Sequence, residues 1–166
     1  LGPKWPKGYW DDWMREPAQR QGRACLRPEI SRTITFGKEG TSQGQFFDQH
    51  LGKMVLNRDP QRFNEMDLTY LLKENYDGPF LHQVDQATEL KGSLNTPLSG
   101  DSKVIYHSYE TFKRLAMQLN IMSDEKAGVP RTAYLGVVTI NKDGHSLYVA
   151  PKQGKPYYTQ VPEAKL

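Results

Sequence analysis

The chain has 166 residues, enough for one domain or for one domain and part of another. Hydrophobic residues make up 37% of it and charged residues 25%, and no apolar run approaches the length of a membrane span. The net charge is +3 with acidic and basic residues interspersed, so no basic stripe indicates nucleic acid as a partner. The composition is that of a polar globular chain.

The first residue is Leu1, and Cys25 is the single cysteine of the sequence. A lone cysteine is most often a small buried hydrophobic residue. It can also be half of a disulfide whose partner lies outside the sequence. Both interpretations stay open at this point, as does the choice between a fragment of a longer protein and a naturally short one.

An aromatic stretch near the N-terminus holds two adjacent carboxylates. Trp10, Trp13 and Met14 have i, i+3 and i+4 spacing, so a helix would place them on one face. Asp11 and Asp12 would point about 100° apart on that helix. A carboxylate beside an aromatic wall suits a general base acting on a sugar. The structural alternative is a helix packed on a core, with acidic residues at its positive end.

The next segment combines a short alternating run with a glycine-rich loop. The alternation over 33–36 predicts a strand, and the first ~37 residues are too few to bury a core by themselves. Three glycines between Gly37 and Gly44, with Thr41 and Ser42, predict a mobile loop whose backbone donors can wrap phosphates. The loop matches neither the Walker pattern nor the dinucleotide pattern, and an ordinary surface loop is the alternative.

The middle of the chain predicts short helices. Asp67 can cap a helix over 68–76, which the Asp-Gly-Pro sequence at 77–79 would end. A second helical stretch is predicted over 80–87, followed by the start of a strand at 88–91 and by a loop over 95–101.

The last part predicts a strand, a helix and a hairpin. The strand covers 103–107, and Ser108 caps a helix whose apolar face is Phe112, Leu115, Ala116 and Leu119. An Asp-Gly pair at 143–144 joins strands over 134–140 and 146–150 into a hairpin. These elements predict a small α+β unit across 74–150. Its histidines show no ligand spacing, so we predict no metal ligand in this chain.

Several motifs together resemble one family. The motifs are PKWP at 3–6, WDDWMR at 10–15, GRAC at 22–25, RPEISRT at 27–33, GQFFDQHL at 44–51, GVPR at 128–131 and VAP at 149–151. With them the chain resembles the C-terminal part of the α-1,3-mannosyl-glycoprotein 2-β-N-acetylglucosaminyltransferases, the N-acetylglucosaminyltransferase I family of the Golgi. The related transferases that act on O-linked mannose share the WD-x-WMR pattern but lack GQFFDQH, which this chain has at 44–50.

The resemblance implies a fold and a location. Residues 1–50 would be the end of a GT-A-type α/β catalytic domain that includes a mobile loop over 37–50. Residues 51–73 would be a linker, and residues 74–166 a small C-terminal α+β domain with antiparallel strands. The parent protein would be a type II membrane protein of the Golgi lumen, with an anchor outside this chain.

The resemblance also implies an activity and its residues. An inverting transferase of this family moves N-acetylglucosamine from UDP-N-acetylglucosamine to O2 of the α-1,3-linked mannose of an N-glycan. Asp11 matches the general base, and Trp10 would shape the acceptor pocket. Thr41 and Ser42 fall where the donor is contacted, in a loop that orders over the sugar nucleotide before the acceptor binds.

Two implied features depend on residues outside this chain. The family holds Mn²⁺ and UDP through a Glu-Asp-Asp motif in its N-terminal half, and this sequence has no such motif. Cys25 matches a cysteine that pairs with one in the earlier part of the catalytic domain. We therefore expect this chain to be catalytically incomplete without the missing N-terminal domain.

Two other functions are compatible with the motifs. One is a non-catalytic module that keeps the acceptor-side surface and binds glycans or a transferase partner. The other is the β-1,2-N-acetylglucosaminyltransferase that acts on O-linked mannose.

Overall fold

The chain divides into two units, with the boundary between Asp59 and Pro60. In the part of the chain that the structure describes, no helix is both long and apolar enough to cross a membrane. The computed structural model describes residues 13–14, 17–21, 23–28, 30–35, 38–39, 44, 47–48, 51–126 and 129–152.

The N-terminal unit has little regular structure among its described residues. It contains the one-turn helix α2 (Pro17–Arg20) and the 3-10 turn η2 (Leu51–Lys53). The strand predicted over 33–36 is wrong for its described residues 33–35. The Ser31 hydroxyl donates to the Thr33 carbonyl at 2.6 Å and accepts from the Thr33 N–H at 3.3 Å. This local turn uses backbone groups that a strand would need for a ladder.

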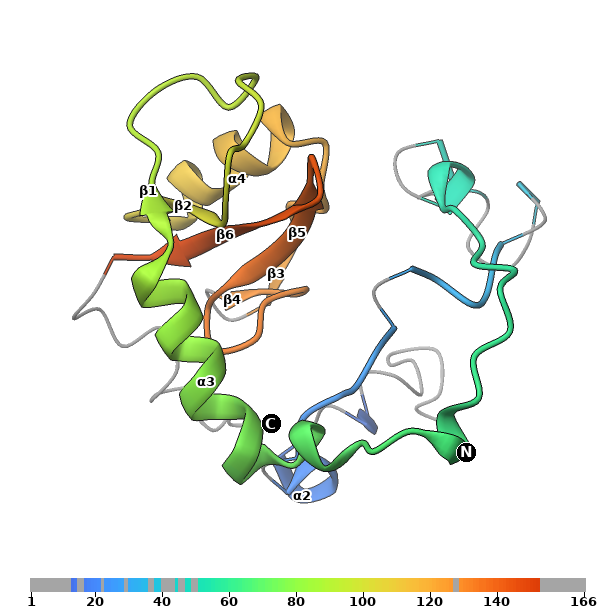
Figure 1. Cartoon of the computed structure of the whole chain (residues 1–166). Coiled ribbons are helices and arrows are strands. Elements are labelled where there is room, and N and C mark those ends of the chain that lie inside the picture. The colour runs from blue at the N-terminus through green and yellow to red at the C-terminus, as the bar shows by residue number, and fades with distance from the viewer. Residues whose placement is uncertain are drawn as a thin grey trace. The chain divides into compact units, whose positions relative to one another are not determined.

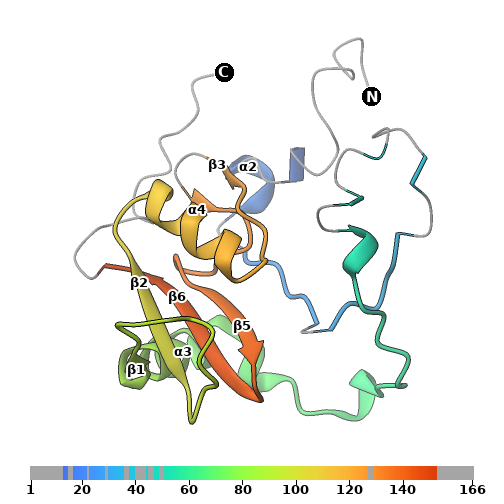
Figure 2. The ribbon, with the colours of Figure 1, turned by 90° about the horizontal axis from the view of Figure 1, so that it is seen from above.

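In its described residues, the C-terminal unit is an α+β structure with a four-stranded sheet, a two-stranded sheet and two α-helices (Figures 1 and 2). This agrees with the predicted α+β class. Its elements are η3 (Phe63–Glu65), η4 (Thr69–Leu71), α3 (Lys73–Gln86), β1 (Thr88–Glu89), β2 (Ser102–Tyr106), α4 (Tyr109–Gln118), β3 (Glu125–Lys126), β4 (Val129–Pro130), β5 (Val138–Lys142) and β6 (His145–Pro151).

The helix predicted over 68–76 is wrong in both its start and its end. The Asp67 carboxylate accepts the Thr69 N–H at 2.9 Å and so begins the 3-10 turn η4 instead of an α-helix. The α-helix begins at Lys73 and continues through Gly78 and Pro79 to Gln86. It therefore joins two stretches that the sequence analysis separates.

Tertiary packing explains why α3 is not broken at Pro79. A proline inside a helix costs about 3 kcal/mol, because it removes one hydrogen bond and crowds the preceding turn. Phe80, directly after Pro79, and Val84, one turn later, are buried. Full burial of two such side chains contributes about 1.5–3 kcal/mol each, which outweighs the local cost.

Helix α4 has the cap and the buried face that the sequence predicts. The Ser108 hydroxyl accepts the Thr111 N–H at 3.2 Å. Phe112 and Ala116 are completely buried, and Leu115 and Leu119 pack beside them. Because these residues recur every three or four positions, one face of the helix lies against the sheet.

The sheet is mixed, with strand order β1-β2-β6-β5. The prediction of antiparallel strands holds for β5 with β6 and for the separate two-stranded sheet of β3 and β4. It is wrong for β1 with β2 and for β2 with β6, which pair in parallel. Parallel neighbours need a crossover connection. Helix α4 lies in the connection from β2 to β6, and the loop over 90–101 makes the connection from β1 to β2.

The hairpin predicted at Asp143-Gly144 is confirmed. Both residues have positive φ angles, 56° and 80°, as a two-residue type I′ turn requires. Lys142 pairs with His145 directly beside the turn, which fixes the register along β5 and β6.

Strand β6 separates two apolar clusters. Leu147 and Val149 pack with the residues of α4, while Tyr148 and Ala150 pack with the residues of α3. Since successive side chains of a strand point to opposite faces, this alternation places one helix on each side of the sheet. A strand buried on both faces is apolar at consecutive positions, as β6 is over 147–150.

Candidate functional site

The four site residues that the resemblance implies, Asp11, Trp10, Thr41 and Ser42, lie outside the described residues. The structure therefore brings none of them together and separates none, and their roles stay predictions. The site is built from the described residues on either side of them, in the N-terminal unit.

Two neighbours of the Asp11-Asp12 pair are described. Trp13 and Met14 have helical backbone, as their spacing predicts. Their side chains are 52% and 51% exposed, so neither is buried in a core within this chain. The structural alternative, a helix packed on a core, finds no support in these two residues. They present an amphipathic aromatic and a thioether to the surroundings.

Two described residues of the glycine-rich segment, Lys38 and Asp48, form an ion pair. The Lys38 ammonium lies 3.0 and 2.9 Å from the two carboxylate oxygens of Asp48. These residues are ten positions apart and flank the segment that carries Thr41 and Ser42. Both side chains are exposed, and ion pairs of this kind are worth about 0–1 kcal/mol. The pair is therefore a weak contact.

Gly44 has a backbone conformation that favours glycine. Its φ angle is +72°, and a Cβ at this position would lie 2.7 Å from the Lys38 carbonyl oxygen. Its own carbonyl oxygen accepts the Phe47 N–H at 2.9 Å. The Phe47 carbonyl in turn accepts the Gly52 N–H at 2.7 Å. Of the three glycines that the sequence analysis names in this segment, Gly44 alone is described, and no sequence pattern indicates its close approach to Lys38.

The segment around Cys25 is exposed. Its thiol lies 3.7 Å from the Leu26 carbonyl oxygen and forms no disulfide within the chain. The interpretation of Cys25 as a small buried residue is therefore wrong. Further along, the Asn57 N–H donates to the Ser31 carbonyl at 2.7 Å, which ties this segment to the end of the unit.

The C-terminal unit contains a charged cluster that the sequence analysis missed. The Lys73 ammonium lies 2.7 Å from the Asp77 carboxylate, and the Tyr134 hydroxyl donates to the same carboxylate at 2.5 Å. Lys73 also donates to the Tyr134 oxygen at 3.3 Å. The i, i+4 spacing of Lys73 and Asp77 is a visible signal, but only for a helix that continues past Asp77.

This cluster shifts the pKa of each member. Hydrogen bonds from Lys73 and then from Tyr134 lower the pKa of the Asp77 carboxyl group. The Asp77 carboxylate raises the pKa of the Lys73 ammonium. Burial, and then the hydrogen bond to Asp77, raise the pKa of the Tyr134 phenol. All three groups therefore keep their charge states over the neutral range, and the cluster acts as a fixed link between α3 and the segment before β5.

The described residues do not fit a metal ion. Among them, no three His, Cys, Asp or Glu side chains come together. We therefore derive no step of a reaction through a metal bound to this part of the chain.

Comparisons with known proteins agree with the family that the sequence motifs indicate. The GNT-I family model matches residues 1–160. A curated relative from Arabidopsis thaliana, named alpha-1,3-mannosyl-glycoprotein 2-beta-N-acetylglucosaminyltransferase, is 42% identical over 142 residues. The match covers 83% of this chain and 32% of the relative, so the chain spans about a third of that protein. These matches confirm the resemblance drawn from the N-terminal motifs: the chain belongs to the GNT-I family.

Proposed function

We propose that this chain is the C-terminal part of an inverting β-1,2-N-acetylglucosaminyltransferase. The enzyme transfers N-acetylglucosamine from UDP-N-acetylglucosamine to O2 of the α-1,3-linked mannose of an N-glycan, the step that starts hybrid and complex glycans. The observation that carries the proposal is the 42% identity to a relative with that name, over 83% of the chain. The GQFFDQH motif at 44–50 favours this acceptor over O-linked mannose.

In the proposed reaction, Asp11 is the general base. The mannose O2 attacks the anomeric carbon of the donor sugar, the bond from that carbon to UDP breaks, and the Asp11 carboxylate takes the proton of O2. Attack from the face opposite UDP inverts the anomeric centre. Trp10 lines the acceptor pocket, and the exposed Trp13 and Met14 support an aromatic surface in the same stretch.

The loop over 37–50 is the proposed lid over the donor. Thr41 and Ser42 contact the sugar nucleotide when the loop closes, and the closed loop completes the acceptor site. The exposed Lys38–Asp48 pair and the positive φ of Gly44 support this role. The pair lies on either side of the residues proposed to contact the donor, and Gly44 adopts a backbone conformation that other residues would strain.

The donor and its Mn²⁺ belong, in this proposal, to the part of the longer protein that this chain does not cover. The described residues hold no group that fits the ion. This chain then contributes the acceptor side and the lid, and it is inactive by itself.

The same proposal extends to the disulfide and to the location. The exposed Cys25 thiol is available to pair with a cysteine of the catalytic domain, in the oxidising lumen of the Golgi. Non-reducing peptide mapping of the longer protein tests the pairing. A free Cys25 in the folded enzyme would remove it.

The role of Asp11 is tested in the longer protein by Asp11→Asn, with Asp12→Asn as the matched control. The first change should lower kcat by at least about 100-fold, a typical general-base contribution, and leave donor affinity unchanged. The second should have a much smaller effect. Near-normal turnover in the Asp11 variant would remove that residue from the mechanism.

Calorimetric titration of this chain with UDP-N-acetylglucosamine and Mn²⁺ tests the proposal that the donor site lies in the part of the longer protein that this chain does not cover. We expect no heat of binding. Clear binding would contradict this proposal and make the glycine-rich segment the candidate donor site. A longer protein that binds glycans but transfers no sugar would favour the non-catalytic binding module.

A further inference from the structure

Among the described residues of the C-terminal unit, the loop over 90–101 is the longest connection without regular structure. It joins two parallel strands without a helix, although such connections usually contain one. Most connections in compact domains have about 4–6 residues, so this one is unusually long. The contacts of this loop show that it is held in place.

Apolar side chains attach the loop to the core beneath it. Leu90, Leu94 and Leu98 recur every fourth residue, and all three pack against the cluster formed by α4 and the sheet. The residues between them are polar, glycine or proline, and all of them are exposed. The loop thus has an anchored side and a polar side that faces solvent.

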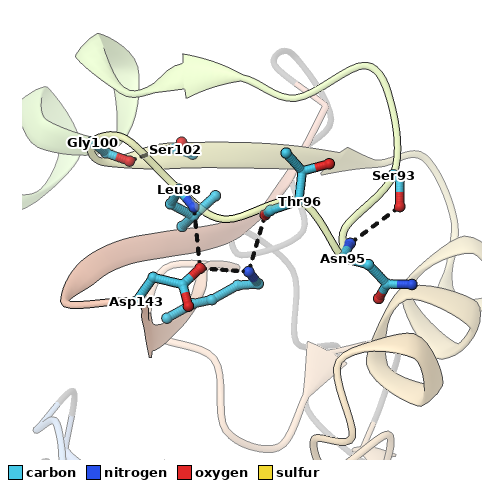
Figure 3. A network of polar contacts seen from close by, with 8 residues as sticks. Ser93, Asn95, Thr96, Leu98, Gly100, Ser102 and Asp143 are labelled. Atoms are coloured by element: carbon cyan, nitrogen blue, oxygen red, sulfur yellow. Dashed lines mark hydrogen bonds and ion pairs between the residues drawn. The ribbon is translucent and has the colours of Figure 1, made fainter.

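Two aspartates attach the loop to the β5–β6 hairpin. The Asp143 carboxylate accepts the Leu98 N–H at 3.1 Å, and the Asp101 carboxylate accepts the Ser146 N–H at 2.8 Å. Lys142 donates to Asp143 at 2.7 Å and to the Thr96 carbonyl at 3.1 Å (Figure 3). Each element therefore holds a backbone amide of the other, which fixes the loop in one conformation.

The tip of this loop and the end of α4 together line a shallow hollow. The Asn95 N–H donates to the Ser93 hydroxyl at 3.2 Å, so the backbone of the tip is ordered (Figure 3). The side-chain amides of Asn95 and Gln118 are exposed, and neither has a partner among the described residues. The hollow is lined by Gly92, Ser93, Leu94, Asn95 and Gln118.

The chemistry of this lining indicates the kind of ligand. No charged side chain lines the hollow, so it offers nothing to a phosphate or a metal ion. Each amide offers donors and an acceptor, which is the pairing that a sugar hydroxyl needs. Leu94 adds an apolar surface for the ring hydrogens of a sugar. Because the loop is already fixed, binding would not have to order it.

We propose that this hollow is a second carbohydrate site, which binds a neutral sugar through the amides of Asn95 and Gln118. Its expected ligand is a mannose unit of an oligomannose chain, and this identity rests on the proposed function. The site would let the C-terminal unit hold a part of the glycan that does not react.

The test is a titration of the 166-residue chain with α-1,3/α-1,6-mannotriose, followed by NMR of side-chain amides. The Asn95 and Gln118 amide signals should shift, with a Kd in roughly the millimolar range for a sugar unit of about 12 heavy atoms. Asn95→Ala and Gln118→Ala should each weaken binding by up to about tenfold, the effect of one neutral hydrogen bond. Gln83→Ala on α3, an exposed amide outside the hollow, should leave the Kd unchanged.

Maltotriose and glycerol separate the possible outcomes. If neither trisaccharide shifts the two amides at roughly 20 mM, or if glycerol shifts them as strongly, the carbohydrate site is refuted. If maltotriose binds and mannotriose does not, the site stands and its mannose identity falls. None of these results depends on transferase activity, which the Asp11 variant tests separately.

Discussion

The two units of this chain differ in where their apolar side chains lie. In the C-terminal unit, two buried clusters cover both faces of one sheet. Among the described residues from 13 to 59, none is buried, and large apolar side chains are half or more exposed at Trp13, Met14 and Leu26. The stability of the chain is therefore concentrated in one unit, and the residues that the family resemblance assigns to catalysis lie in the other.

This difference agrees with the prediction that the first ~37 residues cannot bury a core by themselves. The C-terminal unit is the part of the chain that has a buried apolar core. The N-terminal unit has to obtain its apolar contacts elsewhere, and the relative is about three times as long as the matched region.

The largest expected effect lies in the core of the C-terminal unit. Phe112 is completely buried between α4 and the sheet, where it also packs edge-on against Tyr106 at 5.4 Å between ring centroids. Phe112→Ala should destabilise the chain by about 3–5 kcal/mol, because it removes apolar contacts and leaves a cavity. Urea denaturation followed by circular dichroism measures the loss. A change below about 1 kcal/mol would contradict a single core on that face.

The next effect concerns the link between α3 and the segment before β5. Tyr134→Phe removes the hydroxyl that donates to Asp77 and keeps the ring contacts with Phe80 and Tyr76. We expect a loss of about 1 kcal/mol, the usual net value of one hydrogen bond. A double-mutant cycle with Asp77→Asn measures the coupling directly. Additive effects of the two changes would show that the hydroxyl and the carboxylate do not stabilise each other.

Two glycines, one in each unit, should respond in opposite ways to substitution by alanine. Gly78 lies inside α3, and a Cβ there would have no atom within 4 Å. Gly78→Ala should therefore stabilise the C-terminal unit by about 0.5–1 kcal/mol. Gly44→Ala is the contrasting variant, because the new Cβ would collide with the Lys38 carbonyl. Thermal unfolding of both variants tests the pair, and a destabilising Gly78→Ala would mean that α3 is not a continuous helix.

The sequence predicts the local elements of the C-terminal unit well where the local signal and the packing agree. The cap at Ser108 and the positive-φ turn at Asp143-Gly144 are short-range features, and both are present. Pro79 misleads because its local cost is visible in the sequence, whereas the burial of Phe80 and Val84 is not. The parallel pairing of β2 with β6 depends on contacts between residues more than 40 positions apart, which no local pattern encodes.

The residues of the candidate site could not be predicted from local patterns in this way. Its proposed residues, such as Asp11 and Thr41, come from motif resemblance and lie outside the described residues. The structure adds what the motifs lack, namely the Lys38–Asp48 pair at the base of the loop and the close approach at Gly44. Neither contact has a spacing that sequence periodicity could identify, since a loop has no repeating geometry.

A smaller effect should appear in the pH dependence of the C-terminal unit. The pKa of Asp77 is lowered in the folded state by Lys73 and Tyr134, so its contribution to stability is present above the ordinary aspartate pKa. That contribution is lost as the pH falls through the lowered value. Asp77→Asn and the unchanged chain should therefore converge in stability below about pH 4 and differ by a constant amount from about pH 5 to 8. A difference that persists undiminished at pH 2 would show that the charge of Asp77 is not what stabilises the link.

The smallest effect on the free energy of unfolding is expected at Trp13. This position gives the clearest contrast between the two units. Full burial of a large aromatic side chain would make its removal cost about 3–5 kcal/mol, but Trp13 is 52% exposed and belongs to neither buried cluster. In this chain, Trp13→Ala should change the free energy of unfolding by less than about 0.5 kcal/mol, as for a surface position. In the longer protein, the same change should weaken acceptor binding or lower stability, because the proposed site and its apolar contacts are then complete. Equal and large effects in both proteins would mean that the N-terminal unit has a core of its own, and the contrast between the units would no longer hold.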